Sequence, residues 1–198
     1  MATKFVLQSG GVSNHPAKRA VFHKELVAGM EGKVRFLLCA FAQGRELWEG
    51  RFPDYQDGIA GDMPDEIQPE FELAMPEKFA EQCRAADVIY MHGGDDHLVQ
   101  YWRKQFDLTT LFDQKVVSVN SASSNALATA SWTCDWRAVI DGLGVLPIKF
   151  IPHYKSDWGE DDPRGPIDWE AAYQDLKSYG DDLPIHALEE GDFVVIEQ

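Results

Sequence analysis

Basic residues and cysteines are scarce in this sequence. Its 198 residues contain 18 Lys and Arg against 33 Asp and Glu, a formal net charge of −15. Because binding to a phosphate backbone depends on clustered cations, this balance argues against a nucleic-acid partner. The three cysteines, Cys39, Cys83 and Cys134, have neither CxxC nor Cys/His ligand spacing. This spacing argues against a disulfide framework or a structural zinc site and predicts buried thiols in a reducing compartment.

Long hydrophobic runs and internal repeats are also missing. No stretch reaches membrane-spanning length, and the opening residues MATKFVLQSGG lack the apolar run of a signal peptide. We therefore expect no membrane partner and a cytoplasmic address. Hydrophobic residues make up 44% and charged residues 26%, which is typical of a globular protein. The length predicts one domain over residues 1–198.

The sequence alternates short β-rich apolar runs with segments of helical period. Strands are predicted over 4–8, 33–41, 87–94, 115–120 and 146–154, and helices over 17–28, 76–86, 97–106, 124–132 and 168–179. This alternation predicts an α/β fold with a mostly parallel sheet covered by helices. The last two runs, PIHAL and DFVVIEQ, predict a closing hairpin around Glu189-Glu190-Gly191.

Residues 42–69 interrupt this pattern. They are rich in Gly, Asp, Pro and aromatic residues, and they predict a long loop. One interpretation is a loop whose Trp48, Phe52 and Tyr55 cover a functional site. The other is a plain surface excursion.

The stretch VVSVNSASSNALA (116–128) places Ser121 between a predicted strand and a predicted helix. A nucleophile elbow has this arrangement, with small neighbours because its turn is tight and strained. The alternative is a Ser-rich helix N-cap without a catalytic role. A serine hydroxyl needs a base, and His153, after a Pro at the end of a predicted strand, is the best placed of six histidines.

Two further segments could complete such a site. Glu189 or Glu190 could orient the histidine, and Gly93-Gly94 could point backbone N–H groups at a reacting carbonyl, or simply form a tight turn. His92 and His97 suggest a metal only weakly, because no third ligand has suitable spacing. We expect no metal and no cofactor.

Taken together, the segments DVIYMHGGDDHLVQ, VVSVNSASSNALA, IKFIPHY and HALEEGDFVVI resemble the peptidase E (aspartyl dipeptidase) family of serine peptidases, within the class I glutamine amidotransferase-like superfamily. The resemblance implies a flavodoxin-like sandwich with helices on both faces of the sheet. It also implies a Ser121, His153 and Glu190 triad, and an oxyanion hole formed by the N–H groups of Gly94 and Ala122. By family analogy, a homodimer is expected.

The expected substrate is a small peptide or related amide. Its expected binding residues are Gly93, Asp95, Asp96, Asn125 and Arg164.

Several residues depart from the family pattern. Ser-Ala-Gly-Ala has become Ser-Ala-Ser-Ser at 121–124, the first loop glycine is His92, and the Asn-Thr after the glycines is Asp95-Asp96. Near the position of the family's substrate-binding arginine stands Asp168. These carboxylates would repel an acidic side chain, which speaks against aspartyl specificity.

Two other functions remain open. A catalytically silent relative could bind a small ligand or a protein partner, in which case the substituted loops would be signs of lost chemistry. A glutaminase domain of an amidotransferase is the third reading, but that chemistry uses Cys where this sequence has Ser121.

Overall fold

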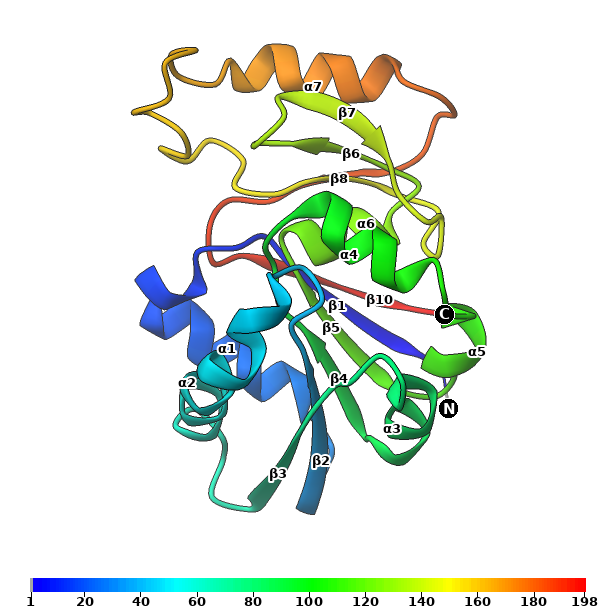
Figure 1. Cartoon of the computed structure of the whole chain (residues 1–198). Helices are drawn as coiled ribbons and strands as arrows, with labels where there is room; N and C mark the ends of the chain where they lie inside the picture. Colours follow the sequence, from blue (N-terminus) through cyan, green and yellow to red (C-terminus); the bar gives the residue numbers. More distant parts are fainter. Residues whose placement is uncertain (1) are drawn as a thin grey trace.

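The main layer is a six-stranded, mostly parallel sheet (Figure 1). The structure is a computed structural model, and it describes residues 2–198. The strand order is β10-β1-β5-β4-β2-β3. The strands are β1 (Lys4–Gln8), β2 (Gly32–Cys39), β3 (Ile67–Leu73), β4 (Val88–Met91), β5 (Val116–Asn120) and β10 (Phe193–Glu197). Along this order, every pair of neighbouring strands from β1 through β5, β4 and β2 to β3 is parallel. Strand β10 pairs antiparallel with β1.

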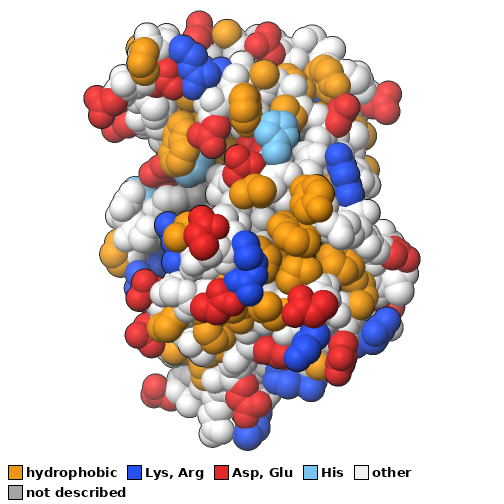
Figure 2. Space-filling view, viewed as in Figure 1, with side chains coloured by type: hydrophobic (Ala, Val, Ile, Leu, Met, Phe, Trp, Pro, Cys, Tyr) orange, Lys and Arg blue, Asp and Glu red, His pale blue; other side chains and the backbone are white. Residues whose placement is uncertain are grey.

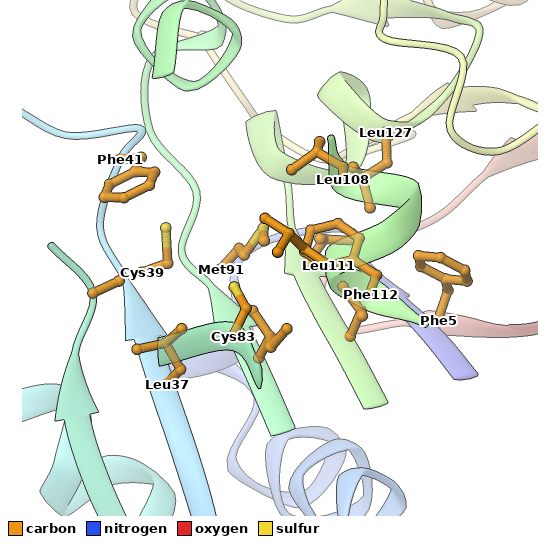
Figure 3. Close-up of a cluster of buried hydrophobic side chains, with 14 of the residues drawn as sticks. Phe5, Leu37, Cys39, Phe41, Cys83, Met91, Leu108, Leu111, Phe112 and Leu127 are labelled. Atoms are coloured by element: carbon orange, nitrogen blue, oxygen red, sulfur yellow. The ribbon is translucent and has the colours of Figure 1, made fainter. Parts of the chain in front are cut away.

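Alternate side chains of this sheet enter two cores. In β2, Leu37 and Cys39 belong to one core and Phe36 and Leu38 to the other. Helices α3 (Phe79–Ala85) and α5 (Leu108–Phe112) pack on the first core, and Figure 3 shows their side chains against the strands. Helices α1 (Pro16–Leu26) and α2 (Trp48–Ala60) pack on the second. Successive side chains of a strand point to opposite faces of the sheet. A strand that is apolar at nearly every position therefore needs helices packed on both faces, as predicted.

A smaller sheet lies above the main one in Figure 1. Its order is β7-β6-β8-β9, with β6 (Ala130–Thr133), β7 (Ala138–Asp141), β8 (Lys149–Ile151) and β9 (Ile185–Ala187). Helix α7 (Trp169–Ser178) packs on this sheet through a core that includes Trp132, Ile151 and Leu176. Helices α4 (Asp96–Arg103) and α6 (Ala122–Leu127) lie between the two sheets.

The two C-terminal strands are joined by the short connection through Glu190. β9 pairs in parallel with β8 in the small sheet, whereas β10 pairs antiparallel with β1 in the main sheet. The predicted pair of strands is present, and the turn between them links the two sheets.

Residues 42–69 are not a long loop, so that prediction is wrong. They form a 3₁₀ turn, η2 (Arg45–Leu47), then α2 and the start of β3; a second 3₁₀ turn, η1 (Val12–Asn14), follows β1. Trp48, Phe52, Tyr55 and Ile59 recur at helical spacing and pack into the cores. Burial of this stripe stabilises α2 even though Pro53 lies inside it.

The helix after Ser121 is shorter than predicted. α6 ends at Leu127, Ala128 is extended, and β6 begins at Ala130. The Thr129 N–H donates to the Ile148 carbonyl at 2.9 Å. This main-chain pairing with the segment before β8 turns the predicted helical residues into a strand.

The three cysteines are buried and form no disulfide, as expected. Burial raises the pKa of the Cys39 thiol to about 12. Within residues 2–198, no helix combines the length and the apolar character needed to cross a bilayer.

Candidate active site

Ser121 stands at a sharp turn between β5 and α6. Its backbone angles are φ 48° and ψ −114°, a conformation that non-glycine residues rarely adopt and that is associated with strained functional turns. The Ser121 N–H donates to the Gln8 carbonyl of β1 at 2.9 Å, and the Ser121 carbonyl accepts from the N–H groups of Ser124 (2.7 Å) and Asn125 (3.0 Å). The sequence therefore forms a strand, a tight turn and a helix in the order that an elbow requires.

The hydroxyl groups of Ser123 and Ser124 explain how the elbow tolerates these residues. Ser123 Oγ donates to the His92 carbonyl at 2.7 Å and accepts from the buried Arg103 guanidinium at 2.8 Å. A second Arg103 nitrogen donates to the Ser123 carbonyl at 2.9 Å. Ser124 Oγ lies 3.0 Å from the carbonyl oxygens of both Gln8 and Val119. Both serines are fully buried and bonded, so they brace the turn.

His153 follows β8 and faces Ser121 from the small sheet. Its Nε2 lies 3.1 Å from Ser121 Oγ. The residue has a positive φ of 53°, and its N–H donates to Ser9 Oγ at 2.7 Å. Gly10 has to be a glycine here, because a Cβ would overlap the imidazole ring. The end of β1 thus shapes the space that the histidine occupies.

Glu190, rather than Glu189, reaches the histidine. Its Oε1 lies 2.8 Å from His153 Nδ1. The turn that carries it is fixed by a hydrogen bond from the Gly191 N–H to the Gly10 carbonyl (2.9 Å) and by Lys18 Nζ donating to the Glu190 carbonyl (3.0 Å). The three side chains form a continuous hydrogen-bonded chain from hydroxyl to carboxylate.

Burial and Glu190 together set the proton affinity of the His153 imidazole. The residue is 4% exposed. Burial lowers its pKa below the ordinary value, and the hydrogen bond and charge of Glu190 oppose this shift. When Nδ1–H donates to the carboxylate, Nε2 presents its lone pair to the serine hydroxyl.

The Gly93-Gly94 loop passes close beside the elbow. A Cβ on Gly93 would lie 2.9 Å from the Asn120 carbonyl oxygen, and one on Gly94 would overlap the Ala42 backbone. Gly94 also has a φ of 150°. Its N–H donates to no protein acceptor within residues 2–198. The Ala122 N–H lies in the first turn of α6, where helical N–H groups have no intrahelical partner.

A cavity of about 180 Å³ adjoins these groups. Its lining includes Ser121, His153, Gly94 and Ala122, together with Asp96 and Asn125 from the predicted binding set. Trp158 also lines it, with its ring 4.2 Å from the His153 ring. The same Trp158 borders a wider groove of about 630 Å³ over the Glu190 turn. In Figure 2 the surface forms a notch where the upper layer joins the main body.

Similarity to known proteins is found in structure and not in sequence. No family model and no curated protein matches this chain. A crystal structure described as a "Putative Peptidase E Protein from Listeria monocytogenes EGD-e" superposes with a TM-score of 0.67, at 12% sequence identity over 100% of this chain and 95% of that chain. The chain has a peptidase E-like fold. At this identity, the similarity describes the fold alone.

Other predicted residues lie outside the cavity of this peptidase E-like fold. Asp95 caps α4 by accepting the Leu98 N–H at 2.8 Å. The Arg164 guanidinium donates to Asp162 and to the Asp135 carbonyl, and Arg164 does not line the cavity. Gly93 acts through close packing against the elbow.

The aromatic residues of segment 42–69 do not cover the site. Trp48 is fully buried in the core, and Tyr55 stacks on His92 at a ring-centroid distance of 3.5 Å. His97 contacts Trp136 at the surface. Within residues 2–198, no three His, Cys, Asp or Glu side chains are grouped as metal ligands.

Several residues that shape the site were not predicted from the sequence. Ser9, Gly10 and Gly11 follow the first predicted strand and were not among the predicted site residues, although a Cβ on Gly11 would come within 2.6 Å of Glu190 Oε2. A glycine pair at the end of a central parallel strand was the available signal, since sites gather at that edge. Trp158 and Arg103 gave no sequence signal, because only the tertiary fold brings them to the elbow.

Proposed function

We propose that this protein is a serine hydrolase that cleaves a small peptide or a related amide. The observation that carries the proposal is the hydrogen-bonded chain Ser121–His153–Glu190, with Oγ–Nε2 at 3.1 Å and Nδ1–Oε1 at 2.8 Å. An activated serine requires this relation among nucleophile, base and orienting carboxylate. The peptidase E-like fold agrees with a hydrolase at a coarser level.

The proposed reaction begins when Ser121 Oγ attacks the carbonyl carbon and its proton passes to His153 Nε2. Glu190 holds the imidazole in the reactive tautomer and stabilises the imidazolium that forms. His153 then returns the proton to the leaving nitrogen as the C–N bond breaks, which leaves an acyl ester on Ser121. Water, deprotonated by His153, attacks the ester, and the serine recovers its proton when the acid is released.

Charge on the tetrahedral intermediate needs donors that are already in position. Gly94 and Ala122 line the cavity beside Ser121, and their N–H groups are the proposed donors. Glycine at 94 supports this role, because the loop lies too close to Ala42 for any side chain.

The substitutions in the elbow do not argue for lost chemistry. Ser123 and Ser124 satisfy their hydroxyl groups within the turn. The Ser121 hydroxyl remains within hydrogen-bond reach of His153. The alternative that the experiment has to exclude is a catalytically inactive protein that binds a ligand. The homodimer stays a prediction from the resemblance.

The test is to treat the wild type with a fluorophosphonate and to locate the adduct by mass spectrometry, alongside a panel of dipeptides with acidic, basic and apolar first residues. We expect one adduct, on Ser121, and hydrolysis that falls on the order of 10⁴-fold in Ser121→Ala. Ser178→Ala, at an exposed serine of α7, is the matched control and should behave as the wild type. The hydrolase proposal would be wrong if no adduct formed on Ser121 and if hydrolysis of the panel were absent or equal in the wild type and Ser121→Ala. The protein would then be interpreted as a catalytically inactive ligand-binding protein.

A further inference from the structure

The lining of the cavity beside Ser121 and His153 is acidic. Asp96 and Asp135 both line the cavity, and neither Lys nor Arg does so among the described residues. Asp96 is 4% exposed. It forms no ion pair with any cation within residues 2–198. An ionised carboxylate so far removed from water is costly unless a positive group pairs with it.

The hydrogen bonds of Asp96 suit its ionised form. Asn125 Nδ2 donates to Oδ1 at 2.9 Å, and Thr133 Oγ1 donates to Oδ2 at 2.6 Å. Burial raises the pKa of this carboxyl, whereas the two donors act against the shift. Each oxygen accepts one hydrogen bond and keeps a lone pair for another donor.

An unsatisfied acceptor stands beside this carboxylate. Asn125 is 2% exposed and lines the same cavity. Its Nδ2 is used by Asp96, and its Oδ1 is buried with no hydrogen-bond partner. Buried polar atoms nearly always have a partner, so an unpaired acceptor on a residue that lines the cavity points to a donor supplied by a bound molecule.

We propose that Asp96 and Asn125 form a specificity subsite for an ammonium-bearing side chain on the acyl part of the substrate. This inference rests on the proposed hydrolase function and names its substrate class, amides and peptides of lysine-like residues. The subsite lines the same cavity as Gly94 and Ala122, so a side chain next to the reacting carbonyl would extend within that cavity. The cavity of about 180 Å³ holds roughly six water volumes, enough for the five heavy atoms of a lysine side chain.

The first experiment compares kcat/KM of the wild type for four dipeptides: Lys-Ala, norleucine-Ala, Glu-Ala and ε-N-acetyl-Lys-Ala. Norleucine has nearly the shape of lysine without its charge. The acetylated peptide keeps the α-ammonium and loses the side-chain ammonium. We expect Lys-Ala to be preferred over norleucine-Ala by about tenfold to a hundredfold, as for a charge-assisted hydrogen bond, and Glu-Ala to be the poorest. Equal use of Lys-Ala and ε-N-acetyl-Lys-Ala would assign the subsite to the α-ammonium and overturn the proposal.

The second experiment replaces the carboxylate. In Asp96→Asn the ratio of kcat/KM for Lys-Ala to kcat/KM for norleucine-Ala should fall to nearly one. Asp107→Asn makes the same charge change at the exposed cap of α5 and should keep the preference. A preference for Lys-Ala that survives in Asp96→Asn would overturn the proposal. If Asp96→Asn does not fold, the wild-type panel still decides.

Binding to Ser121→Ala separates this inference from the hydrolase proposal. Calorimetric titration of that variant with Lys-Ala and norleucine-Ala needs no turnover. Tighter binding of Lys-Ala, lost when Asp96→Asn is added, would support the subsite even if the wild type cleaved nothing. Ser121-dependent hydrolysis that favours norleucine-Ala or Glu-Ala would keep the hydrolase and overturn the subsite. Absence of both binding and hydrolysis for Lys-Ala would overturn the subsite as well.

Discussion

Replacement of His92 by phenylalanine should make the stability of this protein less sensitive to acid. His92 is buried between Tyr55, whose ring stacks on it at 3.5 Å, and Tyr90, whose ring lies at 4.7 Å. Its Nε2 has no hydrogen-bond partner within residues 2–198. Burial lowers the pKa of His92 to about 3, with smaller contributions from His23 and Arg51. Phenylalanine keeps a flat ring for the stack and carries no titrating group.

The magnitude follows from the difference between the folded and unfolded pKa values. The unfolded chain takes up a proton on His92 at a pKa of about 6.5, and the folded protein does so only near 3. The contribution of His92 to the free energy of unfolding is therefore fully present above pH 6.5. It is lost progressively as the pH falls from 6.5 toward about 3. Each pH unit in that interval is worth about 1.4 kcal/mol, so lowering the pH from 7 to 5 removes about 2 kcal/mol through this residue.

Urea unfolding at pH 7, 6 and 5, followed by tryptophan fluorescence, measures this effect. The wild type should lose about 2 kcal/mol more than His92→Phe between pH 7 and pH 5, with unchanged m-values. Other buried histidines contribute equally to both proteins. Tyr55→Phe perturbs the same stack but retains His92, so its pH dependence should match the wild type. Parallel stability curves for the wild type and His92→Phe would refute the reasoning.

Four other substitutions have defined outcomes. Glu190→Gln should reduce kcat/KM by about 10²- to 10⁴-fold and move the acid limb of the pH-rate profile to lower pH, because the carboxylate raises the pKa of His153. Trp158→Ala should move the acid limb to higher pH, toward 6.5, because loss of the indole ring exposes the His153 imidazole to water. An acid limb that moves in neither Glu190→Gln nor Trp158→Ala would show that another group titrates. Gly94→Ala should cost about 1–3 kcal/mol in urea unfolding and lower kcat as well, and full activity would contradict the close packing of the loop. Arg103→Met should destabilise by about 1–3 kcal/mol, since two polar atoms of the elbow lose their donors, and a neutral change would show that water replaces them.

The sequence was most informative where a local pattern coincided with a tertiary requirement. β1, β2, β4 and β5 were recognisable because a strand buried on both faces has to be apolar at nearly every position. Ser121 was recognisable because a strained turn excludes bulky neighbours. The choice between Glu189 and Glu190 could not be made from the residues themselves, because both lie in the same turn. It needed the family resemblance, and the structure brings Glu190 to His153.

The sequence was least informative where contacts join distant segments. Arg103 reaches Ser123 across 20 positions and Ser9 reaches His153 across 144, and neither pair leaves a periodic signal. In α2, the glycine and proline content concealed a helical stripe that burial stabilises. The strand order, and with it the division into two sheets, is likewise a property of long-range pairing that no local window contains.

The division into two sheets has a consequence for how activity responds to partial unfolding. Ser121 extends from the main sheet, His153 from the small one, and Glu190 from the crossing between them. The three side chains can form their hydrogen bonds only while the two sheets are packed together. Undocking of the small sheet as a cooperative unit would separate the members of the proposed triad while β1 to β5 stay paired. The proposed activity would then depend on a docking equilibrium and not on global stability. Mild denaturant should accordingly abolish the proposed activity before the amide protons of the main sheet begin to exchange.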